Sequence, residues 1–99
     1  MTTYNRVTII PADTFCAVNG VGFSGLDMSS LPSNLHAMQW YGAWGEEEYM
    51  ELETQRMLPN VRISTLDAYT AVLAEYQILF DIQQQQQEEN AAEATIIEV

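Results

Sequence analysis

The stretch Leu35–Met50, LHAMQWYGAWGEEEYM, decides the fold of this 99-residue chain. Two strand-like arms flank a short connection, Gly42–Gly45, that has a glycine at each end. Short arms of this kind around a glycine-bearing turn predict a β-hairpin. Both tryptophans, the only histidine and the densest run of acids lie within this stretch. We therefore expect the other elements to be arranged around this central hairpin.

The two arms of the hairpin differ in pattern. In the first arm, His36, Met38 and Trp40 form the better candidate for the buried face. In the return arm neither face is cleanly apolar, which predicts an exposed edge strand whose glutamates discourage stray pairing. Arg62, in a later strand, is expected to face these glutamates. An alternative remains that Glu46–Glu48 meets arginines of a partner.

The preceding residues predict further strands. Val7–Ile10 is β-branched throughout and ends at Pro11, which cannot donate to a strand ladder. Thr14–Val18 and Val21–Ser24 are separated by Asn19-Gly20, and Asn-Gly between apolar arms is the strongest short-range hairpin signal. A small antiparallel sheet of about five strands follows from these segments together with the central hairpin.

The pattern changes after one last short strand, Val61–Ile63. Ser64 can cap a helix, and Asp67, three residues later, can complete a variant of the capping box. From there to about Gln87 no residue breaks a helix. We therefore expect an α+β fold, in which a small antiparallel sheet of β-hairpins over residues 1–63 precedes a long C-terminal α-helix. The helix and tail, residues 64–99, are expected to form one structural unit with the sheet.

The predicted helix has two apolar faces. One broad stripe, suited to covering the sheet, comprises Leu66, Tyr69, Leu73, Tyr76 and Phe80. Ile78 and Ile82 lie on roughly the opposite side, where they are available to another chain. Self-association through the helix and simple packing on the sheet are both open interpretations. The β-prone end, Thr95–Val99, either adds to another chain's sheet or frays.

The charge balance excludes several classes of partner. There are 14 acidic residues, three arginines and no lysine, for a formal net charge of −11. Such a chain repels nucleic acid and anionic membranes, so neither is expected as a partner. Three interpretations of the negative charge are open: it keeps the protein soluble, it matches a basic surface of a partner, or it mimics a nucleic-acid backbone. The last alternative would make the protein an acidic inhibitor of a host nucleic-acid-binding protein.

No catalytic, cofactor-binding or metal-binding residues are identified. Cys16 and His36 are single and lie in different predicted hairpins, so no nucleophile–base pair or ligand set can be assembled from the sequence. Cys16 is expected to be a core thiol, and His36 a packed core histidine. No apolar stretch approaches the roughly 20 residues that cross a bilayer, and no signal-peptide pattern begins the chain. We expect a non-enzymatic protein that folds in a cytoplasm.

Two segments of the central hairpin resemble a family of small proteins of tailed bacteriophages. The segments are Leu35–Trp40, with its His-Ala-apolar-Gln-Trp pattern, and Gly45–Tyr49, with its Gly-Glu-x-Glu-aromatic pattern. The likeness extends over roughly residues 13–49. One departure is Glu47, where the family pattern has an apolar residue. The family consists of tail fibre assembly or accessory proteins.

This resemblance implies a function in the phage tail. The protein is expected to bind a tail fibre or baseplate protein, as an assembly chaperone or as a retained structural component. It would be found in the virion tail, or in the host cytoplasm during assembly, and a homotrimer would match the usual symmetry of fibres. The side chains expected to contact the partner are Trp40, Tyr41, Trp44, Tyr49, Ile78 and Ile82.

Overall fold

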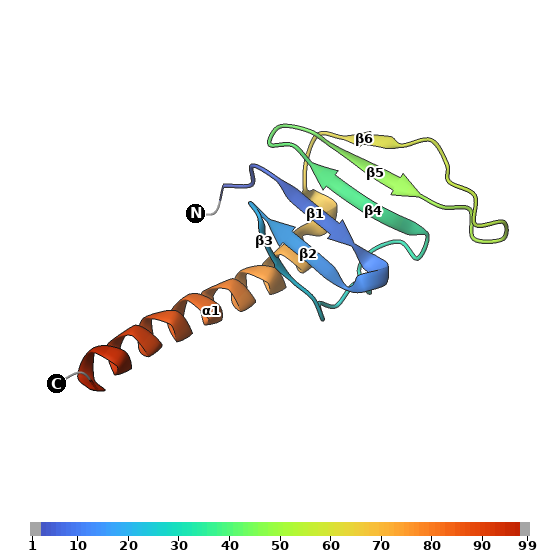
Figure 1. Cartoon of the computed structure of the whole chain (residues 1–99). Coiled ribbons are helices and arrows are strands. Elements are labelled where there is room, and N and C mark those ends of the chain that lie inside the picture. Colours follow the sequence, from blue (N-terminus) through green and yellow to red (C-terminus); the bar gives the residue numbers. More distant parts are fainter. Residues whose placement is uncertain (1–2, 98–99) are drawn as a thin grey trace.

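A computed structural model describes the backbone of residues 3–97 and the side chains of residues 3–88. It contains one antiparallel sheet, in the strand order β3-β2-β1-β4-β5-β6, followed by one long helix (Figure 1). The predicted α+β class is therefore confirmed. The strands are β1 (Val7–Ile10), β2 (Phe15–Val18), β3 (Val21–Phe23), β4 (Leu35–Trp40), β5 (Gly45–Tyr49) and β6 (Val61–Ile63).

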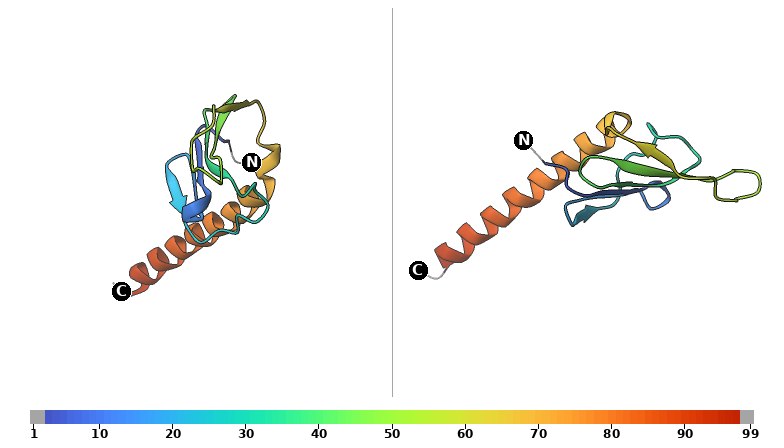
Figure 2. Two further views of the ribbon diagram at one scale, coloured as in Figure 1. Left: turned by 90° about the vertical axis from the view of Figure 1, so that its right-hand side faces the viewer. Right: turned by 90° about the horizontal axis from the view of Figure 1, so that it is seen from above.

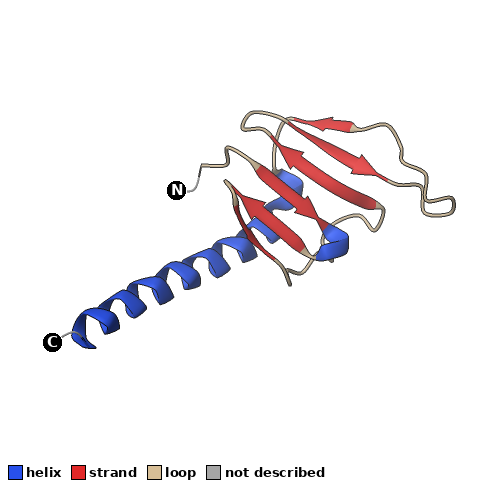
Figure 3. Ribbon diagram, viewed as in Figure 1, coloured by secondary structure: helices blue, strands red, loops and turns tan. Residues whose placement is uncertain are grey.

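The sheet is built from hairpins, as Figure 3 shows by its succession of neighbouring strands. The predicted Asn19-Gly20 turn joins β2 to β3, and its two residues have φ angles of 52° and 89°. Positive φ at both positions suits the right-handed twist of the flanking strands. The Asn19 side chain also accepts hydrogen bonds from the backbone N–H groups of Asn5 and Arg6, at 2.9 and 3.1 Å. This turn therefore fixes the chain just before β1.

A bulge in β4 changes which side chains are buried. Met38 and Trp40 lie in the core as expected, but His36 is exposed, and that part of the prediction is wrong. The pairing of β4 with β5 shifts between Leu35 and Ala37, so His36 is an extra residue without a partner in the register. A bulge of this kind breaks the alternation of the strand, so the residues before it change face relative to those after it. Leu35 is consequently turned into the core, where it is 4% exposed.

The return arm, β5, is not the edge of the sheet, so the predicted edge strand is wrong. It pairs with β6 through Gly45, Glu46 and Glu47. Its inward face is buried, because Glu47 is only 8% exposed. The expected pairing of Arg62 with these glutamates already implied a neighbour for this arm, and the run of glutamates conceals the buried position of Glu47.

One face of the sheet carries the core. The strand registers bring Val7, Cys16, Met38 and Glu47 to the same side of the sheet, and the first turns of the helical segment pack on that side (Figure 2). The predicted core position of Cys16 is confirmed, since its side chain is fully buried. The buried members of the predicted helix stripe and its neighbourhood are Tyr69, Val72, Leu73 and Tyr76.

The α-helix begins later than the sequence indicates. Asp67–Tyr69 forms a short 3₁₀ turn, and the α-helix, α1, spans Thr70–Ile97. The predicted Ser64 cap is not formed; the N–H of Asp67 instead points to the Thr65 hydroxyl at 3.4 Å. Burial of Tyr69 against the sheet sets where the chain turns, and this tertiary contact overrides the local capping pattern.

The helix runs out past the β3 side of the sheet (Figures 1 and 2). Its 28 residues extend about 42 Å at about 1.5 Å per residue. The molecule is accordingly elongated, with principal extents of 63, 28 and 18 Å. Residues 95–97 of the β-prone end belong to the helix, and residues 98–99 of that prediction lie outside the described residues.

Candidate protein-binding surfaces

The turn between β4 and β5 presents two aromatic side chains. The N–H of Tyr41 donates to the carbonyl oxygen of Trp44 at 2.8 Å, and Gly42 has a φ of 99°, so the turn is tight. The two rings lie against each other, with centroids 4.7 Å apart and planes inclined by 42°. Tyr41 is 39% exposed and Trp44 is half-buried. The pair is therefore accessible to another molecule.

An arginine lies over each ring. The guanidinium carbon of Arg6 is 5.0 Å from the Tyr41 ring centroid, and that of Arg62 is 4.6 Å from the Trp44 centroid. Both distances fit cation–π attraction. We call Arg6, Tyr41, Trp44 and Arg62 the arginine–aromatic row. Its order follows the strand order β1-β4-β5-β6, because each member flanks or belongs to one of these strands.

The arginine–aromatic row lies on the sheet face that α1 leaves uncovered. Each member is adjacent in sequence to a residue that occupies an inward, helix-facing position of the sheet. Adjacent strand residues point to opposite faces, so the row points away from the helix. The inward neighbours are Val7, Trp40, Gly45 and Ile63, which share one register across the four strands.

Two other aromatics of the predicted contact surface are less accessible, since Trp40 lies in the core and Tyr49 is partly buried beside it. Trp40 is 6% exposed, and its indole N–H donates to the carbonyl oxygen of Tyr4 at 3.1 Å. Tyr49 is half-buried and packs against the core; burial and the adjacent Glu47 raise the pKa of its hydroxyl. The placement of Trp40 on an accessible surface is wrong, because strand alternation directs it to the helix side. The sequence pattern already placed Trp40 on the more apolar face.

Glu47 is a buried acid. In the sequence it stood out only because the family pattern has an apolar residue at this position. The hydroxyl of Tyr69, a residue 1% exposed, donates to a Glu47 carboxylate oxygen at 2.5 Å. Burial and this carboxylate raise the pKa of Tyr69. No cation neutralises Glu47 within the described residues 3–88, where the ion pair is that of Arg56 with Glu51. The contact joins β5 to the start of the helical segment, so we interpret Glu47 as structural.

The outer side of α1 presents the second accessible apolar surface. Ile78 is 61% exposed and Ile82 is 46% exposed, although full burial of an isoleucine side chain contributes about 1.5–3 kcal/mol. They lie four residues apart and therefore on one side of the helix. From Asp81 to Glu88 only Gln83 is partly shielded. This length of helix is therefore available to a partner.

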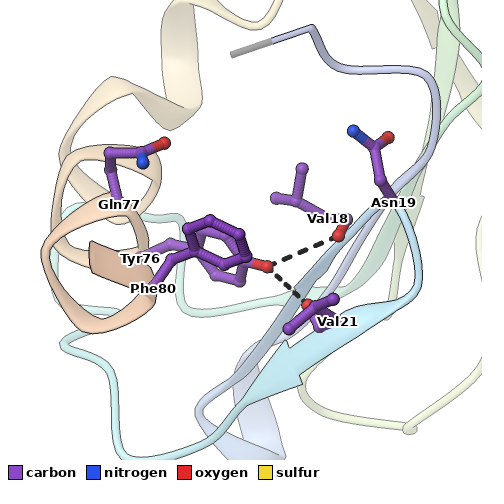
Figure 4. Close-up of a pocket in the computed structure, with 6 residues that line it drawn as sticks. All are labelled: Val18, Asn19, Val21, Tyr76, Gln77 and Phe80. Carbon is purple, nitrogen blue, oxygen red and sulfur yellow. Dashed lines mark hydrogen bonds between the residues drawn. The ribbon is translucent and has the colours of Figure 1, made fainter. Parts of the chain in front are cut away.

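A small pocket of about 140 Å³ lies between the β2–β3 turn and α1 (Figure 4). The hydroxyl of Tyr76 donates to the carbonyl oxygen of Val21 at 2.6 Å and approaches that of Val18 at 3.4 Å. These contacts tie the helix to both arms of the hairpin. The pocket has no acid, cysteine or histidine in its lining, so it offers no carboxylate, thiol or imidazole.

His36 borders a separate pocket of about 260 Å³, between the chain around Pro32 and the start of β4. None of the residues lining it is a cysteine or an acid. Among the described side chains, no group of three or more histidines, cysteines or acids is placed to hold a metal ion. The expected absence of enzymatic activity stays a prediction.

In the described part of the chain, no helix has the length and apolar character needed to cross a membrane. Comparisons with protein-family models, with curated proteins and with solved structures give no match. A functional assignment therefore depends on the two accessible surfaces, the arginine–aromatic row and the Ile78–Ile82 side of α1, together with the resemblance of the central hairpin.

Proposed function

We propose that this chain is a non-enzymatic, tail-associated protein of a bacteriophage that binds a tail fibre or baseplate protein. It acts as an assembly chaperone or remains in the particle as a structural component. The resemblance of Leu35–Trp40 and Gly45–Tyr49 to small tail fibre assembly and accessory proteins supports the phage context. The two accessible surfaces support binding to another polypeptide.

The observation that carries this proposal is the exposed apolar side of a helix that runs beyond its own sheet. A monomer gains nothing by exposing Ile78 and Ile82, at 61% and 46%, on a helix whose other side already packs on the sheet. Amphipathic helices commonly bind protein partners by placing apolar side chains at i and i+4 into a groove. Burial of both isoleucines would contribute a few kcal/mol to such a complex.

The alternative, mimicry of a nucleic-acid backbone, receives less support from the arrangement of charges. A mimic needs acids spaced over one exposed face, whereas Glu47 is buried against Tyr69. Arg6 and Arg62 lie on the same outer face as Glu46, which interrupts any continuous acidic surface. Competition with DNA for a host protein at low salt is the measurement that would favour mimicry.

Co-purification tests the proposed function. The tagged protein is expressed together with tail fibre and baseplate proteins of the same phage, and the bound proteins are identified by mass spectrometry. We expect the wild-type protein to retain one of them, and the double variant Ile78→Ser/Ile82→Ser to lose it. Leu52→Ser is the matched control, because Leu52 is 59% exposed but lies in the β5–β6 connection, in a separate part of the chain. Retention of no virion component by the wild-type protein contradicts the proposal.

Two further measurements separate the roles within this function. Mass spectrometry of purified particles distinguishes a retained component from a chaperone that leaves after assembly. Light scattering of the purified protein tests whether it forms a trimer, as fibre symmetry suggests. If α1 mediates self-association, Ile78→Ser/Ile82→Ser should make it monomeric.

A further inference from the structure

The two arginines of the row are unusual in a protein with such an excess of acids. Fourteen acidic residues are available, yet Arg6 and Arg62 form no ion pair with any described acid. Arg62 is opposite Glu46 in the register, as the sequence predicted, but its guanidinium lies over Trp44. The Glu46 carboxylate accepts instead from the Asn60 amide at 3.2 Å. Two of the three cations are therefore held on rings, with their charge not neutralised by an ion pair.

Stacking on a ring leaves an arginine ready to bind an anion. A guanidinium that lies flat on a ring has one face covered by it, and the N–H groups around its edge stay available as donors. These groups can donate in pairs to a carboxylate. Because the rings of Tyr41 and Trp44 hold the two guanidinium groups in place, less side-chain entropy is lost on binding.

The strand order sets the spacing between the two cations. Arg6 and Arg62 flank or belong to strands three intervals apart in the sheet. Neighbouring strands lie about 4.8 Å apart, so the backbone positions of the two arginines are separated by about 14 Å. The steps of 5.0, 4.7 and 4.6 Å from one guanidinium carbon through the two ring centroids to the other place the cations at most about 14 Å apart. An extended polypeptide covers this distance in about four residues at about 3.3 Å each. Between the cations lie the two rings, which can accept an apolar side chain.

We propose that the arginine–aromatic row binds an extended acidic segment of a protein partner. The segment carries two carboxylates about four residues apart, one for Arg6 and one for Arg62, and an apolar side chain between them over Tyr41 and Trp44. This inference deepens the proposed function, on which it rests, by giving the chemistry of the partner. It uses a surface separate from the Ile78–Ile82 side of α1.

Charge favours a polypeptide over the other anionic occupants. Nucleic acid carries a continuous line of phosphates, and Glu46 and Glu48 beside the row would repel those that do not contact an arginine. The net charge of −11 would add to this repulsion. An acidic peptide places its carboxylates only where the arginines lie. A second copy of this chain would bring a further eleven negative charges to the interface, so a heterologous partner fits better.

Titration with a defined peptide tests this inference. The probe is a short synthetic peptide that has two aspartates four positions apart, a valine midway, and serine or glycine elsewhere. At low salt we expect a Kd on the order of 0.1–1 mM, with shifts of the Trp44 ring resonances but not those of the buried Trp40. We expect Arg6→Gln or Arg62→Gln to weaken binding about five- to tenfold each, because each variant loses one charge-assisted contact. Arg56→Gln, whose arginine pairs with Glu51, is the matched control and should leave Kd unchanged.

Several results would overturn the inference. Absence of binding by the wild-type protein at millimolar peptide would do so, as would equal binding of a peptide with asparagines in place of the aspartates. If Arg56→Gln weakened peptide binding as much as Arg6→Gln or Arg62→Gln, the loss would follow from the change in net charge and not from the row. If a single-stranded oligonucleotide bound more tightly than the peptide, the row would be a nucleic-acid site. If the protein formed dimers without peptide and Arg62→Gln dissociated them, the row would be an interface between two copies of the chain. Ile78→Ser/Ile82→Ser should bind the peptide normally, so failure here is distinguishable from failure of co-purification.

Discussion

Replacing Tyr69 by phenylalanine tests whether the buried Glu47 is stabilised by its tyrosine partner. The change removes one hydroxyl from a side chain that is 1% exposed, and that hydroxyl donates to a carboxylate that is 8% exposed. A hydrogen bond to a charged group contributes about 1.5–3 kcal/mol. Phenylalanine occupies almost the same volume, so repacking adds little. We expect Tyr69→Phe to lower the free energy of unfolding by about 1.5–3 kcal/mol at neutral pH.

Urea unfolding followed by circular dichroism measures this loss. Thermal unfolding should show the same loss. In a domain of this size, each kcal/mol lost from the free energy of unfolding lowers Tm by roughly 4–8 °C, so the variant should melt about 6–24 °C lower. Tyr41→Phe is the matched control because Tyr41 is 39% exposed and lies on the opposite face of the sheet. It should change the free energy of unfolding by less than about 0.5 kcal/mol.

A double-mutant cycle makes the reasoning refutable. Glu47→Leu alone leaves the buried Tyr69 hydroxyl without its acceptor, which costs about 1–3 kcal/mol. With both groups replaced, in Glu47→Leu/Tyr69→Phe, neither the buried carboxylate nor the buried Tyr69 hydroxyl is present to be left without its partner. We therefore expect the double variant to be about as stable as the wild-type protein, or more stable. If the two single costs simply add, within about 0.5 kcal/mol, the two groups do not act as a pair.

Three further predictions concern pH, the thiol and the β2–β3 turn. Burial raises the pKa of Cys16 to about 12, and burial together with Glu47 raises the pKa of Tyr69. The folded state therefore holds these two protons more tightly than the unfolded state, so the stability they contribute is complete below pH about 9 and is lost as the pH rises toward the folded-state pKa values. Urea unfolding between pH 8 and 11 should show a falling free energy of unfolding, and the fall should be smaller in Tyr69→Phe. The Cys16 thiol is fully buried, so a thiol reagent should label it only at the rate of unfolding, and rapid labelling of the native protein would contradict this. Asn19→Ala should lower stability by about 1–3 kcal/mol, because it removes bonds to three backbone groups and places alanine at a φ of 52°; Asn19→Gly, which keeps that φ without strain, should recover about 1 kcal/mol of the loss in urea unfolding.

The candidate surfaces were predictable only in part. Tyr41, Trp44, Ile78 and Ile82 are accessible, as the helix periodicity and the turn position indicate. Trp40 is not, because the same alternation that makes a strand amphipathic turns it toward the helix. The arginine–aromatic row was not foreseen. Arg6 and Arg62 are far apart in sequence, and only the pairing of β1 with β4 and of β5 with β6 brings them to one line.

The sequence by itself determined the local elements of this protein. Asn19-Gly20 predicts a turn because both residues adopt positive φ more readily than most. The stripe from Leu66 to Phe80 predicts a helix with one buried side. The tertiary structure alone decided that a bulge turns His36 outward and that Glu47 lies inside against Tyr69. Each of these depends on contacts between residues distant in the chain, and their energies exceed the local preferences that a sequence pattern records.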